Sequence, residues 1–172
     1  MDTEVEKSSR GSSFVGYVIS RCQQDNGLAA ALRRADNPAT EYQSWELLAG
    51  FNIDLEKPWQ RLPFAAVGAA VARAKLEKNG SSGLGAALAA CYDDGNNSDQ
   101  AKAKLRRVLA CDSVEECCRV LRPLFSLIDS KAKVTLDYGR LLDELLKFHW
   151  DPPVIKARWA QDFYRRAIEV QP

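Results

Sequence analysis

The 172-residue chain has a single histidine, His149, and none of its five cysteines forms a Cys-x-x-Cys pair. A histidine needs a nucleophile or a set of metal ligands beside it to take part in catalysis, and the sequence shows no such set. The glycine-rich segment 79–83 lacks the Gly-Lys-Ser/Thr that completes a phosphate-binding P-loop. We therefore expect no enzyme, no metal site and no cofactor, and we interpret His149 as a helix-cap or packing residue.

Long hydrophobic runs are missing as well. No segment approaches the ~18 to 20 consecutive apolar residues of a membrane span. Residues 1–12 are polar and lack the apolar stretch of a secretory signal. We expect these residues to form a disordered tail, and we expect the protein to be cytoplasmic and free of the membrane.

Cysteines in a chain without an export signal are expected to stay reduced. The adjacent pair Cys117-Cys118 comes nearest to a metal-binding or redox spacing, but both residues fall on an apolar stripe. We predict buried thiols that pack as small hydrophobic residues, with metal or redox chemistry as the alternative.

The chain also lacks the alternation of apolar and polar residues that marks a strand, and it shows no fixed-period repeat. Hydrophobic residues make up 46% of the sequence, enough for a core, and they recur at helical spacing. We predict an all-α fold of about eight helices in two small bundles, an N-terminal lobe at 13–92 and a C-terminal lobe at 98–172. One of these helices, after Pro38, is expected to bury Tyr42 and Trp45.

The segment 98–129 organises this prediction, because it contains two consecutive amphipathic helices. In the first, the apolar residues Ala101, Leu105, Val108 and Leu109 share one stripe. The remaining surface holds four cations with no acid among them: Lys102, Lys104, Arg106 and Arg107.

The second helix begins after Asp112 and Ser113, which offer N-cap chemistry, and it has Glu115 and Glu116 in its first turn. Its core face is a nearly unbroken set of apolar residues: Val114, Cys117, Cys118, Leu121, Leu124, Phe125 and Ile128. Arg119 and Arg122 lie one turn apart on its polar side. Pro123 is expected to kink or split it.

Charge is unevenly distributed along a chain whose formal net charge is only +1. Residues 1–56 carry five basic and nine acidic side chains, whereas residues 57–111 carry nine basic and four acidic ones. A basic middle attracts polyanions, and arginine suits bidentate phosphate recognition. We interpret the arginines as a groove for a phosphate backbone, with surface salt bridges as the alternative.

Further cations lie outside the central segment. Arg33 and Arg34 end a short helix before Pro38, where the helix dipole alone would favour them, so phosphate contact is one of two interpretations. Lys156 and Arg158 lie on the outer side of a last helix that starts at Pro152-Pro153.

Several short motifs occur together in a fixed order. They are Asp25-Asn26-Gly27 with Leu32-Arg33-Arg34, Gly83-Leu84-Gly85-x-x-Leu88, Lys104-Leu105-Arg106-Arg107-Val108-Leu109 with Asp112, Leu121-Arg122-x-Leu124, and Trp159-Ala160-x-Asp162-Phe163-Tyr164. Over roughly residues 14–168 the chain resembles the CasB family, the small subunits of the type I-E CRISPR interference complex, Cascade.

The resemblance implies a non-catalytic, two-lobed helical subunit that sits as a homodimer along the inner side of Cascade. There it would bridge the large subunit and the backbone subunits that hold the guide RNA. Its basic surface would support the target strand and the displaced non-target strand of the R-loop. Guide pairing reads the sequence in such complexes, so contacts to the nucleic-acid backbone suffice.

Carried over by position, Arg33, Arg34, Lys104 and Arg122 match family positions where basic residues face nucleic acid. Helix geometry adds Arg106, Arg107 and Arg119, and the basic C-terminal region of the family adds Lys156 and Arg158. A second hypothesis, of a different class, is a helical adaptor that only joins proteins and uses its arginines in salt bridges.

Overall fold

The computed structural model describes residues 8–165, which form nine α-helices and two short 3₁₀-helices. Their bounds are α1 Arg10–Gln24, α2 Asn26–Leu32, η1 Glu41–Ser44, α3 Trp45–Gly50, α4 Pro58–Ala74, α5 Leu84–Ala89, η2 Gly95–Asn97, α6 Asp99–Leu109, α7 Val114–Lys131, α8 Tyr138–Phe148 and α9 Pro152–Tyr164. Within these residues the only β-type pairing is an isolated bridge between Ser82 and Leu136. The predicted all-α class is confirmed.

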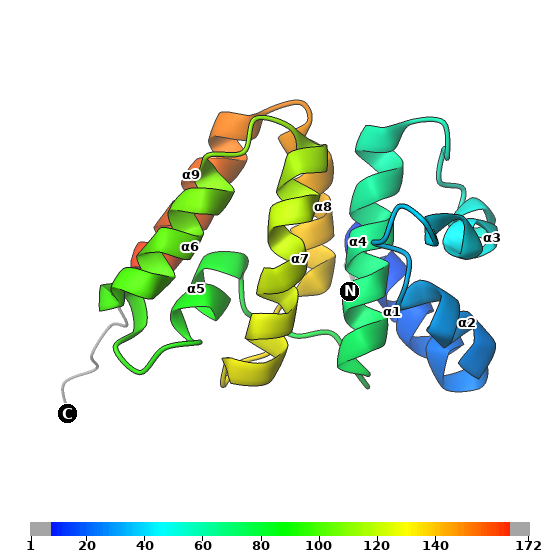
Figure 1. The fold of residues 1–172 in the computed structure, drawn as a ribbon, viewed down its shortest axis with the longest axis horizontal. Coiled ribbons are helices and arrows are strands. Elements are labelled where there is room, and N and C mark those ends of the chain that lie inside the picture. Colours follow the sequence, from blue (N-terminus) through cyan, green and yellow to red (C-terminus); the bar gives the residue numbers. More distant parts are fainter. Residues whose placement is uncertain (1–7, 166–172) are drawn as a thin grey trace, which may run out of the picture.

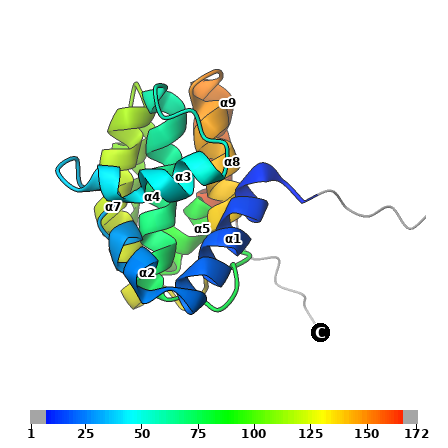
Figure 2. The same cartoon turned by 90° about the vertical axis from the view of Figure 1, so that its right-hand side faces the viewer.

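The three helices α4, α7 and α8 stand side by side in the middle of the molecule (Figure 1). On one side, α1 packs against α4 and α8, and α2 packs against α4. On the other, α9 packs against α8, while α5 and α6 lie next to α9. Figure 2 shows α3 crossing the outer face of α4. Among the described residues, no helix is both long and apolar enough to cross a membrane.

One contiguous cluster of buried side chains runs through this arrangement, from Phe14 in α1 to Phe163 in α9. Its largest members include Trp159, Phe64 and Phe148, each at most 1% exposed. Helices from both predicted lobes therefore contribute to the same core. The division of the chain into two lobes stays a prediction.

Two of the tightest helix contacts depend on glycine. Gly11 in α1 faces the backbone of Gly139 in α8, and a Cβ at Gly139 would lie 2.8 Å from the Cα of Ser12. In the same way Gly85 in α5 lies against the backbone of Trp159 and Phe163 in α9. Two of the sequence motifs, Gly-Leu-Gly and Trp-Ala-x-Asp-Phe, are thus the two sides of one helix–helix contact.

Two helices, α1 and α7, differ from the expected ones. Helix α1 begins at Arg10 because the Ser9 side chain accepts a hydrogen bond from the Ser12 amide at 3.1 Å, so residues 10–12 belong to a helix and not to the expected tail. Residues 1–7 of that tail lie outside the described residues. Helix α7 runs through Pro123 without interruption, so this proline does not split it.

The segment after Pro38 is a correction. It forms the 3₁₀-helix η1 followed by the short helix α3, and its aromatic side chains do not point into the core. Tyr42 is 61% exposed and Trp45 is 36% exposed, with the guanidinium carbon of Arg61 lying 5.6 Å from the centre of the Trp45 ring. The apolar spacing is real, but Leu47 and Leu48 fill the available core space instead.

Candidate nucleic-acid interface

Helices α6 and α7 are defined by the caps that their sequence predicts. Ser98 accepts a hydrogen bond from the Ala101 amide at 3.2 Å, and Ser113 accepts one from the Glu116 amide at 3.1 Å. Glu116 in turn accepts from the Asp112 amide at 3.0 Å, which satisfies a further amide at the helix start. With both starts fixed, Ala101, Leu105 and Val108 and the seven apolar residues of α7 are buried, and the cations are directed outward.

Three cations from these helices line one concave surface: Lys104 and Arg107 of α6 and Lys131 at the end of α7. We call it the α6–α7 basic surface. Tyr92 and Asp93, from the segment after α5, also line it, and Asp93 is its one acid among the described residues. None of the three cations forms an ion pair within residues 8–165. Their charges are therefore available to an external anion.

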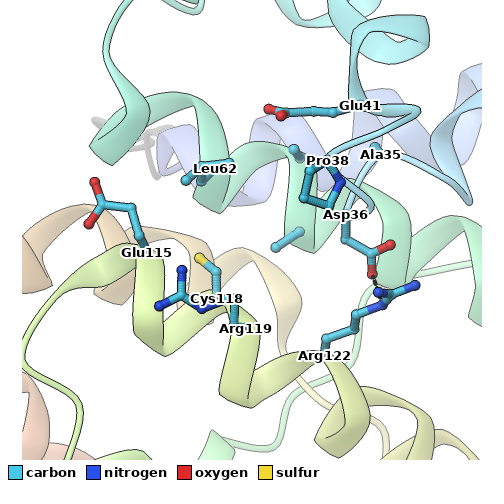
Figure 3. Close-up of a pocket in the computed structure, with 11 residues that line it drawn as sticks. Ala35, Asp36, Pro38, Glu41, Leu62, Glu115, Cys118, Arg119 and Arg122 are labelled. Atoms are coloured by element: carbon cyan, nitrogen blue, oxygen red, sulfur yellow. Dashed lines mark ion pairs between the residues drawn. The ribbon is translucent and has the colours of Figure 1, made fainter.

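Arg119 and Arg122 lie on a different side of α7, in a second hollow. This cleft, of about 350 Å³, lies between α7, α4 and the loop that follows α2, and its floor includes Leu62, Ala65 and Ala66. Figure 3 shows the Asp36 carboxylate extending from the loop toward the guanidinium group of Arg122. The two groups form an ion pair at 3.4 Å, so Arg122 already has an acidic partner within the chain.

Asp36 holds a second arginine more closely. Its carboxylate lies 2.7 Å from a guanidinium nitrogen of Arg73 in α4, and the Asp36 side chain is only 6% exposed. Neither oxygen of this carboxylate has a directional hydrogen bond among the described residues, so its charge is balanced by the two arginines. Arg73 and Arg122 also line a shallow hollow next to Ser126. Asp36 thus competes with any external anion for both guanidinium groups.

The remaining predicted cations are dispersed. Arg33 and Arg34 are exposed, and helix α2 ends at Leu32, so Arg33 is its C-cap and neither arginine lies in its last turn. Arg106 is exposed on α6. Lys156 lies with its ammonium group 5.9 Å from the centre of the Phe148 ring. The predicted set therefore forms two groups, Lys104 with Arg107 and Arg119 with Arg122, and the other residues are not brought into either hollow.

Arg158 lies beside a buried carboxylate, that of Glu144. It lies 3.8 Å from Glu144 of α8, which also has Arg140 at 3.7 Å and accepts a hydrogen bond from the Trp159 indole at 3.2 Å. The Glu144 side chain is 2% exposed. Burial raises the pKa of this carboxyl, while the Trp159 hydrogen bond and the two arginines act in the opposite direction. Arg158 is therefore at least partly committed to an internal partner.

We expect Glu144→Gln to change how stability depends on pH. The folded state holds the Glu144 proton more tightly than the unfolded chain does, so this group stabilises the fold below its ordinary pKa, near 4.5, and that contribution is lost as pH rises through the raised value. The free energy of unfolding of Glu144→Gln should thus gain on wild type as pH rises. Denaturant titrations at several pH values measure it, with exposed Glu56→Gln as the control. If the free energy of unfolding of Glu144→Gln minus that of wild type stays constant or falls with rising pH, this account is wrong.

The cysteines are all free thiols, and three of them, Cys111, Cys117 and Cys118, are buried as predicted. Burial raises the pKa of Cys118 to about 12, which keeps it protonated and unreactive near neutral pH. Cys22 and Cys91 are half-buried. Within residues 8–165 no group of three or more histidine, cysteine or acidic side chains is placed to hold a metal ion.

Sequence reasoning misses two cations that the structure places beside predicted ones. The apolar pattern predicts a helix end at Asp129 and a connector at Lys131, yet α7 continues to Lys131. The sequence does contain a signal for the longer helix: Lys131 comes four residues, about one helical turn, after Leu127, which is half-buried. Arg73 resembles an ordinary helix-end charge, and nothing in the sequence links it to Asp36.

Comparison with known proteins places this fold. The model of the family described as CRISPR-associated protein Cse2 matches residues 28–164. The crystal structure of M. ruber CasB is similar with a TM-score of 0.70 and 24% identity, over 92% of this chain and 94% of that one. A CRISPR-associated protein of the Cse2 family from Thermus thermophilus gives a TM-score of 0.69 and 23% identity, over 91% of this chain and 98% of that one.

A chain of a CRISPR RNA-guided surveillance complex is similar with a TM-score of 0.73 and 23% identity, over 91% of this chain and 92% of that one. At these identities the likeness shows a shared fold. No curated protein matches the chain significantly in sequence. The family match is the stronger finding, because it spans most of the chain in sequence. The chain belongs to the CRISPR-associated Cse2 family.

Proposed function

We propose that this protein is the non-catalytic small subunit of a type I-E Cascade complex in the cytoplasm. In this role it bridges the large subunit and the backbone subunits as a homodimer, beside the guide RNA, and its basic surface stabilises the target and displaced strands of the R-loop. Family membership supports the setting, and one structurally similar chain comes from an RNA-guided surveillance complex. The observation that carries the nucleic-acid role is the α6–α7 basic surface.

Three cations around one hollow, with one acid, suit a phosphate backbone. Lys104 and Arg107 lie one helical turn apart on α6, and Lys131 faces them from the end of α7. Contacts from such side chains go to phosphate and sugar and carry little sequence information. A subunit that relies on guide pairing for sequence needs no more than this.

The test is a salt titration of single-stranded DNA binding. Neutralising Z phosphates on a single strand gives a log–log slope of about −0.7Z, so the variant Lys104→Ala/Arg107→Ala/Lys131→Ala should reduce the slope by about 2. The control variant Lys57→Ala/Lys78→Ala/Lys147→Ala removes the same charge from exposed positions outside this surface. A smaller slope in the first variant and a nearly unchanged slope in the second would support the proposal. Equal slopes in both would remove the basic surface from it.

One observation supports the alternative hypothesis, that the protein is an adaptor which only joins other proteins. Arg122 pairs with Asp36 and Arg158 with Glu144, so these two predicted contacts already serve internal ion pairs. If the first variant binds DNA like wild type but no longer joins the other Cascade subunits, the adaptor function replaces the nucleic-acid function.

A further inference from the structure

An aromatic ring, that of Tyr92, lies beside the three cations of the α6–α7 basic surface. Tyr92 belongs to the short segment between α5 and α6, and it lines the same hollow as Lys104, Arg107 and Lys131. In Figure 1 this segment and the end of α7 both lie in the lower part of the molecule. The proposed function assigns the cations to phosphate groups and gives the ring no role.

The structure holds this ring in place. Tyr92 is half-buried and packs against the hydrophobic core. Its backbone is hydrogen-bonded on both sides, because the Tyr92 amide donates to the Ala89 carbonyl at 3.2 Å and the Tyr92 carbonyl accepts from the Gly95 amide at 3.0 Å. A side chain that is already ordered loses little conformational freedom when it binds a ligand.

The Tyr92 ring has no aromatic or cationic partner of its own. Within residues 8–165 it takes part in no aromatic pair and in no cation–π contact. Burial raises the pKa of its hydroxyl group, so the side chain stays uncharged near neutral pH. It therefore does not repel the phosphate groups that the neighbouring cations attract.

The hollow has room for a nucleobase. Its volume of about 850 Å³ is within the range of pockets that enclose drug-sized ligands, and a nucleobase is smaller than these. The charged residues that line it are Lys104, Arg107, Lys131 and Asp93, three cations and one acid. A positively charged groove with an aromatic side chain on its wall is the combination with which proteins bind single-stranded nucleic acids.

We propose that Tyr92 is a stacking platform for an unpaired nucleobase, so that the α6–α7 basic surface binds a single strand in preference to a duplex. This inference rests on the proposed function, which supplies the nucleic acid, and it adds the residue that contacts a base. Lys104, Arg107 and Lys131 neutralise phosphate groups while one base lies on the Tyr92 ring. Stacking tolerates any sequence, because every base has a π-face. Bases in a duplex are already paired and stacked on each other, so they do not reach the ring.

The test compares two single-stranded DNA probes with the same length and the same number of phosphates, one of mixed sequence and one without bases. Wild type should bind the abasic strand about tenfold more weakly, as loss of one base–aromatic stack does. Tyr92→Leu, which keeps an apolar side chain against the core, should bind both strands equally and as weakly as wild type binds the abasic one. Its salt slope should match that of wild type, because no phosphate contact is lost.

Further variants separate stacking from a structural role. Tyr92→Phe keeps the ring and should behave like wild type. Tyr42→Leu removes a ring that is 61% exposed elsewhere, and it should keep the tenfold difference between the strands. Tyr92→Leu should bind a duplex of the same sequence like wild type. In Tyr92→Trp, the fluorescence of the added indole should be quenched by the mixed strand and not by the abasic one.

The outcomes distinguish this inference from the function on which it rests. If wild type binds both strands equally, or if Tyr92→Leu still distinguishes them, the stacking role is wrong and the basic surface stands. If Tyr92→Leu binds the duplex and the single strand more weakly by the same factor, Tyr92 only supports the fold, and the inference is again wrong. If Tyr92→Leu does not fold, Tyr92→Trp decides, since an unquenched indole contradicts stacking. If Lys104→Ala/Arg107→Ala/Lys131→Ala keeps the wild-type salt slope, the nucleic-acid function fails and this inference fails with it.

Discussion

Replacing Gly85 with alanine should destabilise the fold by about 3 kcal/mol, at the upper end of the usual overpacking range. A Cβ at this position would collide with the backbone nitrogen of Phe163 and the backbone carbonyl of Trp159, and it would lie 2.9 Å from the Phe163 Cα. All three atoms belong to the main chain of α9, so no side chain can rotate away. Helices α5 and α9 would have to separate. Denaturant unfolding measures the loss.

The matched control lies in α1. Gly16 is exposed and nothing lies within 4 Å of a Cβ built there, so Gly16→Ala should stabilise the protein by about 0.5–1 kcal/mol through helix propensity alone. The two substitutions are chemically identical and should have opposite signs. Equal effects would mean that the α5–α9 contact is looser than the structure shows.

Replacing Asp36 with asparagine should strengthen single-stranded DNA binding by about tenfold. The substitution frees a guanidinium group for one contact to a DNA phosphate, and a hydrogen bond to a charged group is worth roughly 1.5 kcal/mol or more. The Asp36 carboxylate lies 2.7 Å from Arg73 and 3.4 Å from Arg122. A phosphate group that binds either arginine must compete with this carboxylate. Asparagine keeps the shape and removes the charge. The salt slope should also steepen by about 0.7, for one added phosphate contact.

The control for this prediction is Glu56→Gln, which removes one negative charge from an exposed loop position. It should change affinity little. Asp36→Asn could instead leave DNA binding unchanged and only lower the unfolding temperature. In that case the ion pairs of Asp36 with Arg73 and Arg122 only hold the loop after α2 against helices α4 and α7. Arg122 would then have no part in phosphate binding.

Local signals in the sequence are enough to predict where helices α6 and α7 start and which of their faces are buried. Ser98 and Ser113 both act as caps, and the 3–4 spacing of the apolar residues identifies the buried face. These features depend on residues within four positions of each other, so short-range hydrogen bonding and periodicity determine them. Lys104 and Arg107 can be placed on one surface for the same reason.

Contacts between distant segments cannot be predicted in this way. Nothing near Asp36 indicates that it meets Arg73 and Arg122, and nothing near Trp59 indicates that it stacks on His149. The aromatic character of Tyr42 and Trp45 favours the core, but the core volume near α3 is filled by leucines. Which of these side chains enters the core depends on how all the helices pack together, and a local sequence pattern does not contain that information.

The cap of α5 has a consequence for how the protein is made. The Ala86 amide donates to the Asp162 carboxylate at 2.8 Å, so a six-residue helix in mid-chain is completed by a side chain from α9. Helix α1 likewise packs on α8. During translation α1 and α5 are complete before α8 and α9 have been made, so the α1–α8 and α5–α9 contacts can form only when most of the chain has been synthesised. We expect these two contacts to be among the last to form, and the apolar surfaces that they cover to stay open until then.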